Sequence, residues 1–263
     1  MSKNKNETPE ILVIDVGNTS VRISHYSGMK FKKAARIKTS EIKKSAARVI
    51  KKNFPLKIIK AAVIASVVPA ISRFLTQMIR VRFHVPVFQV GKDISAPIPN
   101  KYRDPRRVGM DRLMNALAVR EEYKLPAIII DFGTAVTFDV VSGKGEYLGG
   151  VIAPGIEISI DALFNKTALL PKIRLTRPRE VIGRDTVESI RIGCAYGIGG
   201  LCDRIVEVVG SKLRSRPFVI ATGGYARFMS RYCHSIQKID PDLVLKGILF
   251  SYQRHCGRKL KST

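Results

Sequence analysis

Two short segments of the chain repeat one pattern, and each has the residue types to hold a phosphate group. Residues 11–20 read ILVIDVGNTS, and residues 128–137 read IIIDFGTAVT. In both, an apolar run ends in an aspartate, and a glycine beside small polar residues follows two positions later. We interpret each as a buried strand, a tight turn and a returning strand. Glycine lets the turn backbone approach a ligand closely, so the pair predicts two turns that hold a polyphosphate and its metal ion.

One copy alone is also compatible with an ordinary hairpin turn. Two copies, one near the start and one near the middle, indicate two similar subdomains. We therefore expect a nucleotide to be held in the cleft between them.

A third segment, VGMDR at residues 108–112, offers a carboxylate and a cation side by side. A phosphotransfer enzyme needs a carboxylate to accept the proton of an attacking hydroxyl, and a cation to stabilise the moving phosphoryl charge. Asp111 and Arg112 supply both groups. Asp111 is equally compatible with a purely structural role, because aspartate is favoured at helix N-caps.

Two further segments are compatible with ligand contact or with local structure. In GRDTVE at residues 183–188, Asp185 and Glu188 fit a capping box, while Thr186 at a helix N-terminus fits an anion or polar ligand. In TGG at residues 222–224, the paired glycines fit either a close approach of adenine or ribose, or a simple turn.

The elements that must position these residues alternate between strand and helix, which predicts a mixed α/β fold. We predict two strands within residues 11–31, a helix over 40–52 with Ser40 as N-cap, a buried parallel strand over 61–69, a helix over 72–83, a strand over 85–90, a loop over 91–109 and a helix over 112–123. In the second half we predict strands from 126 to 155, helices over 156–169 and 186–209, a strand over 217–222 and a final helix from 242.

Composition is that of a folded protein of enzyme size. The 263 residues suffice for about two modest domains. No apolar run approaches the roughly 18 residues that a membrane span needs, and residues 1–10 lack an apolar signal core, so we expect a short disordered lead and a cytoplasmic protein. The four cysteines and four histidines show no zinc spacing, so we expect reduced, partly buried thiols and no structural metal.

The charge is unusual, because 46 Lys and Arg face 21 Asp and Glu, a net charge of +25. Much of the excess lies between residues 30 and 60. Such a surface attracts polyanions, including nucleic acid. The region lacks the interleaved aromatic residues of a single-strand binding platform, so the sequence favours a solvated basic surface over nucleic-acid contact.

Six motifs, in this order, resemble those of type III pantothenate kinases: DVGNT at 15–19, GMDR at 109–112, DFGTA at 131–135, GGVIAPG at 149–155, GRDT at 183–186 and TGG at 222–224. The resemblance extends from residue 11 to residue 249. That family belongs to the superfamily of acetate and sugar kinases, heat-shock ATPases and actin. The resemblance therefore implies two ribonuclease-H-like (actin-like ATPase) subdomains, residues 11–117 and 118–263, with an ATP cleft between them.

The resemblance implies transfer of the ATP γ-phosphoryl group to the terminal hydroxyl of pantothenate, the first step of coenzyme A synthesis, with Asp111 as general base. The ATP-binding positions that it implies are Asp15, Val16, Gly17, Asn18, Thr19, Ser20, Val21, Arg22, Gly133 and Thr134. The positions implied to line the pantothenate pocket are Tyr102, Gly109, Met110, Asp111, Arg112 and Thr186. It further implies that Asp15 faces Mg²⁺ through water, that Asp131 binds K⁺ or NH₄⁺, and that the protein is a homodimer.

The chain departs from the family pattern at Arg22, where many members have Lys or a small apolar residue, and in its strong basicity. Two alternatives stay open. One is a regulatory, transcription-accessory relative. The presence of all the expected catalytic carboxylates argues against it. The other is a kinase for a different small acceptor, against which only the resemblance at residues 102–112 speaks.

Overall fold

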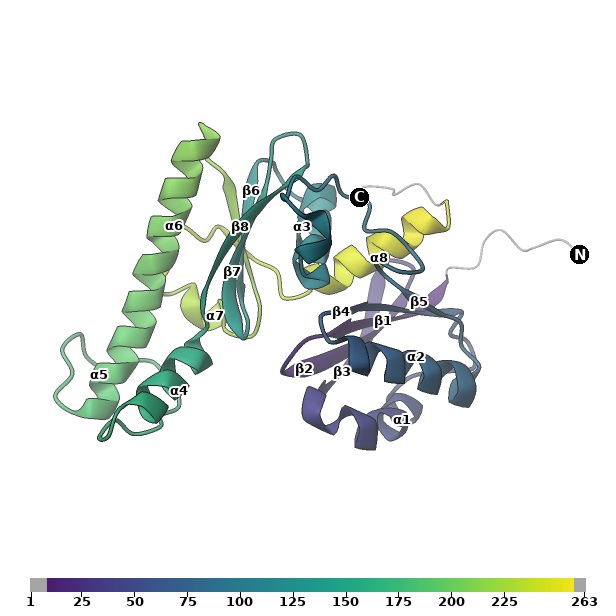
Figure 1. The fold of residues 1–263 in the computed structure, drawn as a ribbon, viewed down its shortest axis with the longest axis horizontal. Helices are drawn as coiled ribbons and strands as arrows, with labels where there is room; N and C mark the ends of the chain where they lie inside the picture. The colour runs from purple at the N-terminus through teal and green to yellow at the C-terminus, as the bar shows by residue number, and fades with distance from the viewer. Residues whose placement is uncertain (1–8, 258–263) are drawn as a thin grey trace, which may run out of the picture. The chain divides into compact units, whose positions relative to one another are not determined.

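The computed structural model describes residues 9–257, which form two compact units (Figure 1). Within the described residues, the first unit comprises the chain up to Ile98, Asp104–Glu121 and the chain from Leu243 onward. The second unit comprises Pro99–Arg103 and Glu122–Asp242. Each unit thus includes a segment from the middle of the chain, and the final helix joins the first unit. Most of the expected disordered lead lies outside the described residues.

The first unit is built on a five-stranded sheet in the order β3-β2-β1-β4-β5. β1 pairs antiparallel with β2, and β2 with β3, whereas β1, β4 and β5 are parallel to one another. The strands are β1 (Glu10–Val16), β2 (Ser20–Ser27), β3 (Lys30–Lys38), β4 (Ala61–Ser66) and β5 (Val87–Gln89).

The second unit repeats this arrangement in a sheet of order β10-β9-β6-β7-β8. Three successive strands pair antiparallel, and the first of them then pairs in parallel with β9, which pairs in parallel with β10. The strands are β6 (Ala127–Phe132), β7 (Ala135–Val141), β8 (Tyr147–Pro154), β9 (Phe218–Thr222) and β10 (Lys238–Ile239). The internal repeat predicted from two ten-residue segments is therefore a repeat of whole sheets.

Helices cover both faces of the first sheet (Figure 1). On one face, Leu12, Ile14 and Val16 pack in a core with α1 (Ile42–Asn53) and α2 (Pro69–Phe83). On the other face, α8 (Leu243–His255) contacts β1 and β4. α8 also packs closely on α3 (Met110–Glu122), because a Cβ on Gly247 would lie 2.6 Å from the carbonyl carbon of Met114. Two short 3₁₀ turns, Thr39–Glu41 and Pro105–Arg107, complete the unit.

The helices of the second unit pack against the side chains of β6 and β7 that include Ile128, Ile130 and Phe138. They are α4 (Ile156–Lys166), α5 (Thr186–Ile192), α6 (Ile198–Leu213) and α7 (Ala226–Met229). A π-helical segment, Gly193–Gly197, joins α5 to α6. The single helix predicted over 186–209 is therefore wrong in two respects, since it contains a π segment and continues to Leu213.

Three local predictions in the first unit were wrong. Ser40 is not the N-cap of α1, because it lies in a 3₁₀ turn and the capping position is Glu41, with no side-chain cap. α2 begins at Pro69 rather than residue 72, since proline is well suited to a first helical turn. β3 was not predicted. It is an edge strand in which only Ile37 is buried, so it lacks the apolar alternation that marks a strand.

Within the described residues, no helix combines the length and the apolar character that a membrane crossing would require. The four cysteines are free thiols, of which three are buried and Cys256 is exposed.

Candidate active site

The first predicted phosphate turn joins β1 to β2. The amide of Gly17 donates to the carbonyl of Ser20 at 3.1 Å, which closes the turn and leaves Asn18 and Thr19 exposed. Thr39, which follows β3, holds this turn through two hydrogen bonds. The Thr39 hydroxyl donates to the Gly17 carbonyl at 2.8 Å, and the Thr39 amide donates to the Thr19 carbonyl at 3.0 Å. The turn is therefore held in shape by a residue that no motif includes.

Asp15 lies on the face of the sheet opposite to α1 and α2. Its neighbours Ile14 and Val16 point into the core beneath those helices, and side chains alternate along a strand. Asp15 pairs across the sheet with Arg22 on β2 and with Ala65 on β4. Directly paired residues share a face, so the carboxylate and the Arg22 guanidinium belong to the same surface beside the turn.

Asp111 belongs to the same unit, in the first turn of α3, where it is half-buried. Its Oδ1 accepts a hydrogen bond of 2.8 Å from the Arg112 amide. Burial raises the pKa of the Asp111 carboxyl above its ordinary value, although the amide and the positive charge of Arg112 oppose this shift. A carboxyl with a raised pKa is a stronger proton acceptor, which suits a general base more than a simple cap.

Gly109 makes room for the Asp111 side chain. A Cβ at position 109 would lie 2.6 Å from Oδ1 of Asp111 and 3.7 Å from Cγ1 of Val67. The Val67 amide in turn donates to the Val16 carbonyl at 3.1 Å, next to Asp15. The first unit therefore places the proposed base beside the end of β4 that borders the phosphate turn. The terminal methyl group of Met110, the residue before Asp111, packs over Gly91.

The second predicted turn joins β6 to β7 and is also closed by its glycine amide, but it is one residue shorter than the first. The Gly133 amide donates to the Ala135 carbonyl at 3.2 Å. Asp131 pairs with Thr137 on β7 and with Thr222 on β9, as Asp15 does with β2 and β4. The Asp131 carboxylate lies close to the turn, since its Oδ1 would be 3.4 Å from a Cβ at position 133.

Two glycines from distant parts of the second unit press against this turn. A Cβ on Gly155 would lie 2.7 Å from the carbonyl carbon of Thr134. Gly223 has a φ of +89°, and a Cβ there would lie 2.6 Å from the carbonyl carbon of Phe132 and would overlap Oδ1 of Asp131. Gly155 and Gly223 thus have a packing role. Gly224 differs, because a Cβ there would meet nothing within 4 Å.

Tyr102 is held by the second unit through the segment Pro99–Arg103. The Tyr147 amide donates to the Pro99 carbonyl, and the Lys101 amide donates to the Tyr147 carbonyl, both at 2.8 Å. The ring of Tyr102 covers Gly149, whose φ of +114° excludes most side chains, and a Cβ there would lie 3.3 Å from the ring.

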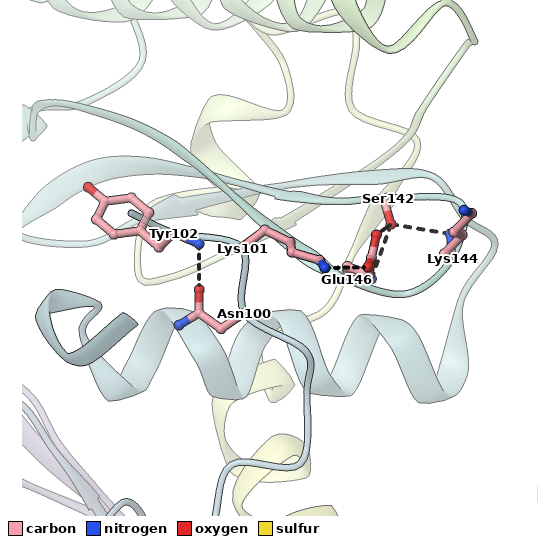
Figure 2. A network of polar contacts seen from close by, with 6 residues as sticks. All are labelled: Asn100, Lys101, Tyr102, Ser142, Lys144 and Glu146. Atoms are coloured by element: carbon pink, nitrogen blue, oxygen red, sulfur yellow. Dashed lines mark hydrogen bonds and ion pairs between the residues drawn. The ribbon is translucent and has the colours of Figure 1, made fainter. Parts of the chain in front are cut away.

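Figure 2 shows the polar contacts that anchor this segment. Nζ of Lys101 lies 3.3 Å from Oε1 of Glu146 in the β7–β8 hairpin, and the Ser142 hydroxyl lies 3.3 Å from the other oxygen of Glu146. The Tyr102 amide donates to Oδ1 of Asn100 at 3.0 Å. The ring of Tyr102 points away from the ion pair, so the network holds the backbone of the loop without involving the ring.

Thr186 is exposed at the start of α5. Asp185 caps this helix, because its carboxylate accepts from the Glu188 amide at 2.8 Å. The predicted capping box is only half formed. The Glu188 carboxylate accepts from the Arg179 amide rather than reaching back to Asp185.

The structure divides the predicted site residues into two sets. The first unit contains Asp15, Val16, Gly17, Asn18, Thr19, Ser20, Val21, Arg22, Gly109, Met110, Asp111 and Arg112. The second contains Tyr102, Asp131, Gly133, Thr134 and Thr186. Sequence reasoning missed the supporting roles of Thr39, Lys101 and Glu146, which belong to no motif and carry no local signal.

The fold defines the class of protein. A protein from Campylobacter jejuni assigned to the Baf family of transcriptional activators is similar over 94% of this chain and 99% of its own, with 16% identity and a TM-score of 0.62. The activator of 2-hydroxyisocaproyl-CoA dehydratase from Clostridium difficile, solved with bound ADPNP, is similar over 97% of this chain and all of its own, with 13% identity and a TM-score of 0.51. The fold is that of the actin-like ATPases, an α/β architecture with two subdomains.

Sequence comparison then narrows this class to one family. The family described as type III pantothenate kinase matches residues 11–208. The type III pantothenate kinase of Moorella thermoacetica is 38% identical over 253 residues, which is 93% of this chain and 99% of the relative. The chain belongs to the type III pantothenate kinase family.

Proposed function

We propose that this protein transfers the γ-phosphoryl group of ATP to the terminal hydroxyl of pantothenate, which gives 4′-phosphopantothenate in the first step of coenzyme A biosynthesis. The observation that carries the reaction class is Asp111, a half-buried carboxylate with a raised pKa on the unit that also holds Asp15. The identity of the acceptor is supported by the family, whose members are named for this activity.

Asp111 acts as the general base. It accepts the proton of the pantothenate hydroxyl while the oxygen forms a bond to the γ-phosphorus. The bond from that phosphorus to the bridging oxygen breaks, and ADP leaves with the electron pair. Phosphoryl transfer depends mostly on placement and charge stabilisation, so one positioned carboxylate suffices for the proton. The Arg112 amide holds Oδ1 of Asp111 and thereby fixes which oxygen is directed toward the acceptor.

The two turns bind the phosphates through their backbone. The turns at residues 17–20 and 133–134 follow the central strands β1 and β6, and successive N–H groups of such turns bind anions. The donor set also fits a hard divalent cation. Mg²⁺ is usually held by one or two carboxylates together with substrate phosphates, and Asp15 supplies such a carboxylate beside the first turn. Bound there, Mg²⁺ would neutralise phosphate charge.

Asp131 is the proposed ligand of a monovalent cation, K⁺ or NH₄⁺. Its carboxylate lies against the second turn and is held in place by the close approach of Gly223. Carboxylate and backbone carbonyl oxygens can coordinate K⁺ and can accept hydrogen bonds from NH₄⁺. Replacement of potassium by sodium should therefore raise the KM for ATP, and activity that is indifferent to the monovalent cation would remove this role from Asp131.

Tyr102, Met110, Arg112 and Thr186 complete the proposed pantothenate contacts, and we include a homodimer in the proposal because the family typically forms one. The decisive experiment measures phosphorylation of pantothenate by the purified protein with ATP, Mg²⁺ and K⁺. Phosphopantothenate identified by mass spectrometry is the expected result. ATP turnover with N-acetylmannosamine or another small alcohol, but not with pantothenate, would show that the protein phosphorylates a different acceptor. No phosphoryl transfer to any acceptor would favour a regulatory relative.

A further inference from the structure

Twelve cations on β3, α1 and the loop after α1 form a basic surface on the first unit. They are Lys30, Lys32, Lys33, Arg36, Lys38, Lys43, Lys44, Arg48, Lys51, Lys52, Lys57 and Lys60. Each of the twelve is exposed. α1 packs against the face of β3 that carries Ile37, and Lys33 shares that face, whereas Arg36 and Lys38 lie on the opposite face of this edge strand. Glu41 is the single carboxylate between residues 30 and 60. The proposed kinase reaction uses none of these twelve residues.

The distribution of charge on α1 is not explained by the stability of the fold. Its apolar side, Ile42, Ala46 and Ile50, is fully buried in the core. At about 100° per residue, the five cations of α1 fall within one sector of about 180° around the helix axis, on the side opposite the apolar residues. Lys51 and Lys52 complement the dipole in the last turn, but the other three gain nothing from it. Among the described residues, no ion pair within 4.0 Å joins any of the twelve to a carboxylate.

The charge of Lys32 helps to lower the pKa of Glu10, but so many like charges repel one another and lower stability, so this surface has the character of a binding surface for a large polyanion. Nine residues of β3 span about 30 Å at roughly 3.3 Å each, which matches several successive phosphates of a nucleic acid rather than one small anion. An anionic membrane fits less well, because a membrane-bound helix inserts apolar side chains and those of α1 are committed to the core.

We propose that this basic surface binds the phosphate backbone of nucleic acid without reading its bases. The aromatic residues between positions 30 and 60 are Phe31, which is 47% exposed, and Phe54, which is buried. One exposed ring cannot provide a row of stacking platforms, so the contacts are to phosphates. This inference stands independently of the proposed kinase reaction.

The test measures binding of the full chain to a labelled 20-base-pair DNA duplex and a labelled 20-nucleotide RNA by fluorescence anisotropy at several salt concentrations. One variant removes four cations of α1, with Lys43, Lys44, Arg48 and Lys51 each changed to Gln. A matched control removes four exposed cations of the second unit, with Lys166, Arg177, Lys212 and Arg216 each changed to Gln. Glutamine is a good helix former, and thermal unfolding checks that both variants fold.

The wild type should bind with an affinity that falls steeply with salt. The α1 variant should bind at least about tenfold more weakly, and its slope of log K against log salt should be smaller by up to about 4, since each phosphate contact contributes about 0.9. The control variant should bind within about twofold of the wild type. Equal losses in the two variants would show that net charge alone drives binding and would overturn the proposal. Absence of binding at about 0.1 M salt, or preference for phosphatidylglycerol vesicles over both nucleic acids, would also overturn it.

Discussion

The two Asp–Gly turns share one pattern, and in each the glycine amide closes the turn, onto the third residue after Gly17 and the second after Gly133. Their surroundings differ. The first turn is supported by polar contacts, in which Thr39 holds the carbonyls of Gly17 and Thr19. Asp111 lies in the same unit, beside the end of β4 that borders this turn. The second turn is supported by direct backbone packing, where Gly155 and Gly223 leave no room for a side chain.

This difference indicates a division of labour within a duplicated fold. Polar support and a titratable carboxylate suit the proposed proton transfer and metal ion at the first turn. Close backbone packing suits the anion and monovalent cation proposed at the second turn. We therefore propose that the same pattern serves two purposes, according to the residues around it.

The largest expected effect comes from Asp111→Asn. The change removes the proton acceptor and keeps an oxygen for the Arg112 amide, so kcat should fall by at least about 100-fold. The melting temperature should rise, because the ionised carboxylate is destabilised by burial and asparagine carries no charge. The control is Glu41→Gln, at an exposed carboxylate of the same unit, which should leave kcat unchanged. Full activity in Asp111→Asn would end its assignment as the base.

The close packing of Gly223 on the second turn is tested by Gly223→Ala, with Gly224→Ala as the matched control at the next residue. Gly223→Ala should lower the free energy of unfolding by at least about 2 kcal/mol, since it combines a positive φ with overlap on Phe132 and Asp131. Gly224→Ala should cost less than about 0.5 kcal/mol, because a Cβ there meets open space. Urea denaturation measures both values, and equal losses would show that the second turn is not rigidly packed.

The pH dependence of kcat/KM tests the environment of Asp111. The base must be ionised, so below its folded pKa the rate should fall about tenfold for each pH unit. Because burial raises this pKa, the acidic limb should lie above the ordinary aspartate value of 3.8. Between the ordinary pKa and the raised pKa of the folded state, the folded protein binds the proton more tightly than the unfolded chain, so protonation in this pH range favours folding. A limb at the ordinary value would mean that the carboxylate is well solvated in solution.

The polar support of the first turn is tested by Thr39→Ala, with Thr39→Ser as the matched control. Alanine removes the hydrogen bond to the Gly17 carbonyl and should cost about 1 kcal/mol of stability, together with a several-fold higher KM for ATP. Serine keeps the hydroxyl and should retain most of both properties. If the alanine and serine variants have the same KM for ATP, the hydrogen bond from the Thr39 hydroxyl does not shape the turn.

The smallest expected effect is that of Glu146→Gln in the hairpin that anchors the Tyr102 loop. Loss of the ion pair with Lys101, which is partly exposed, should cost less than about 1 kcal/mol of stability. The KM for pantothenate should rise about threefold because the loop is less firmly placed, whereas kcat and the KM for ATP should stay unchanged. An equal rise in the KM for ATP would point to a general loss of structure.

The sequence allowed both turns to be predicted because their signal is local: an apolar run, an aspartate and a glycine within seven residues. It did not distinguish whether Asp111 is a cap or a base, since both roles favour aspartate at the start of a helix. The structure adds the burial of the carboxylate, which depends on the packing of Gly109 and Val67 around it and supports the proposed role as base. β3 escaped prediction because its residues are nearly all exposed, and an edge strand needs no alternation of apolar side chains.

The sequence by itself determined the repeat, the family and the residue types available for phosphoryl transfer, because each is encoded in short stretches or in overall similarity. Only the tertiary structure decided how those residues are supported. Gly155 reaches Thr134 and Thr39 reaches Gly17 across hairpins of consecutive strands, whose register no motif encodes. Gly223 reaches Asp131 through the parallel pairing of β9 with β6, which depends on the packing of the whole sheet. The basic run at residues 30–60 was visible in the sequence, but only the fold showed that it divides between the edge strand β3, α1 and the loop after α1.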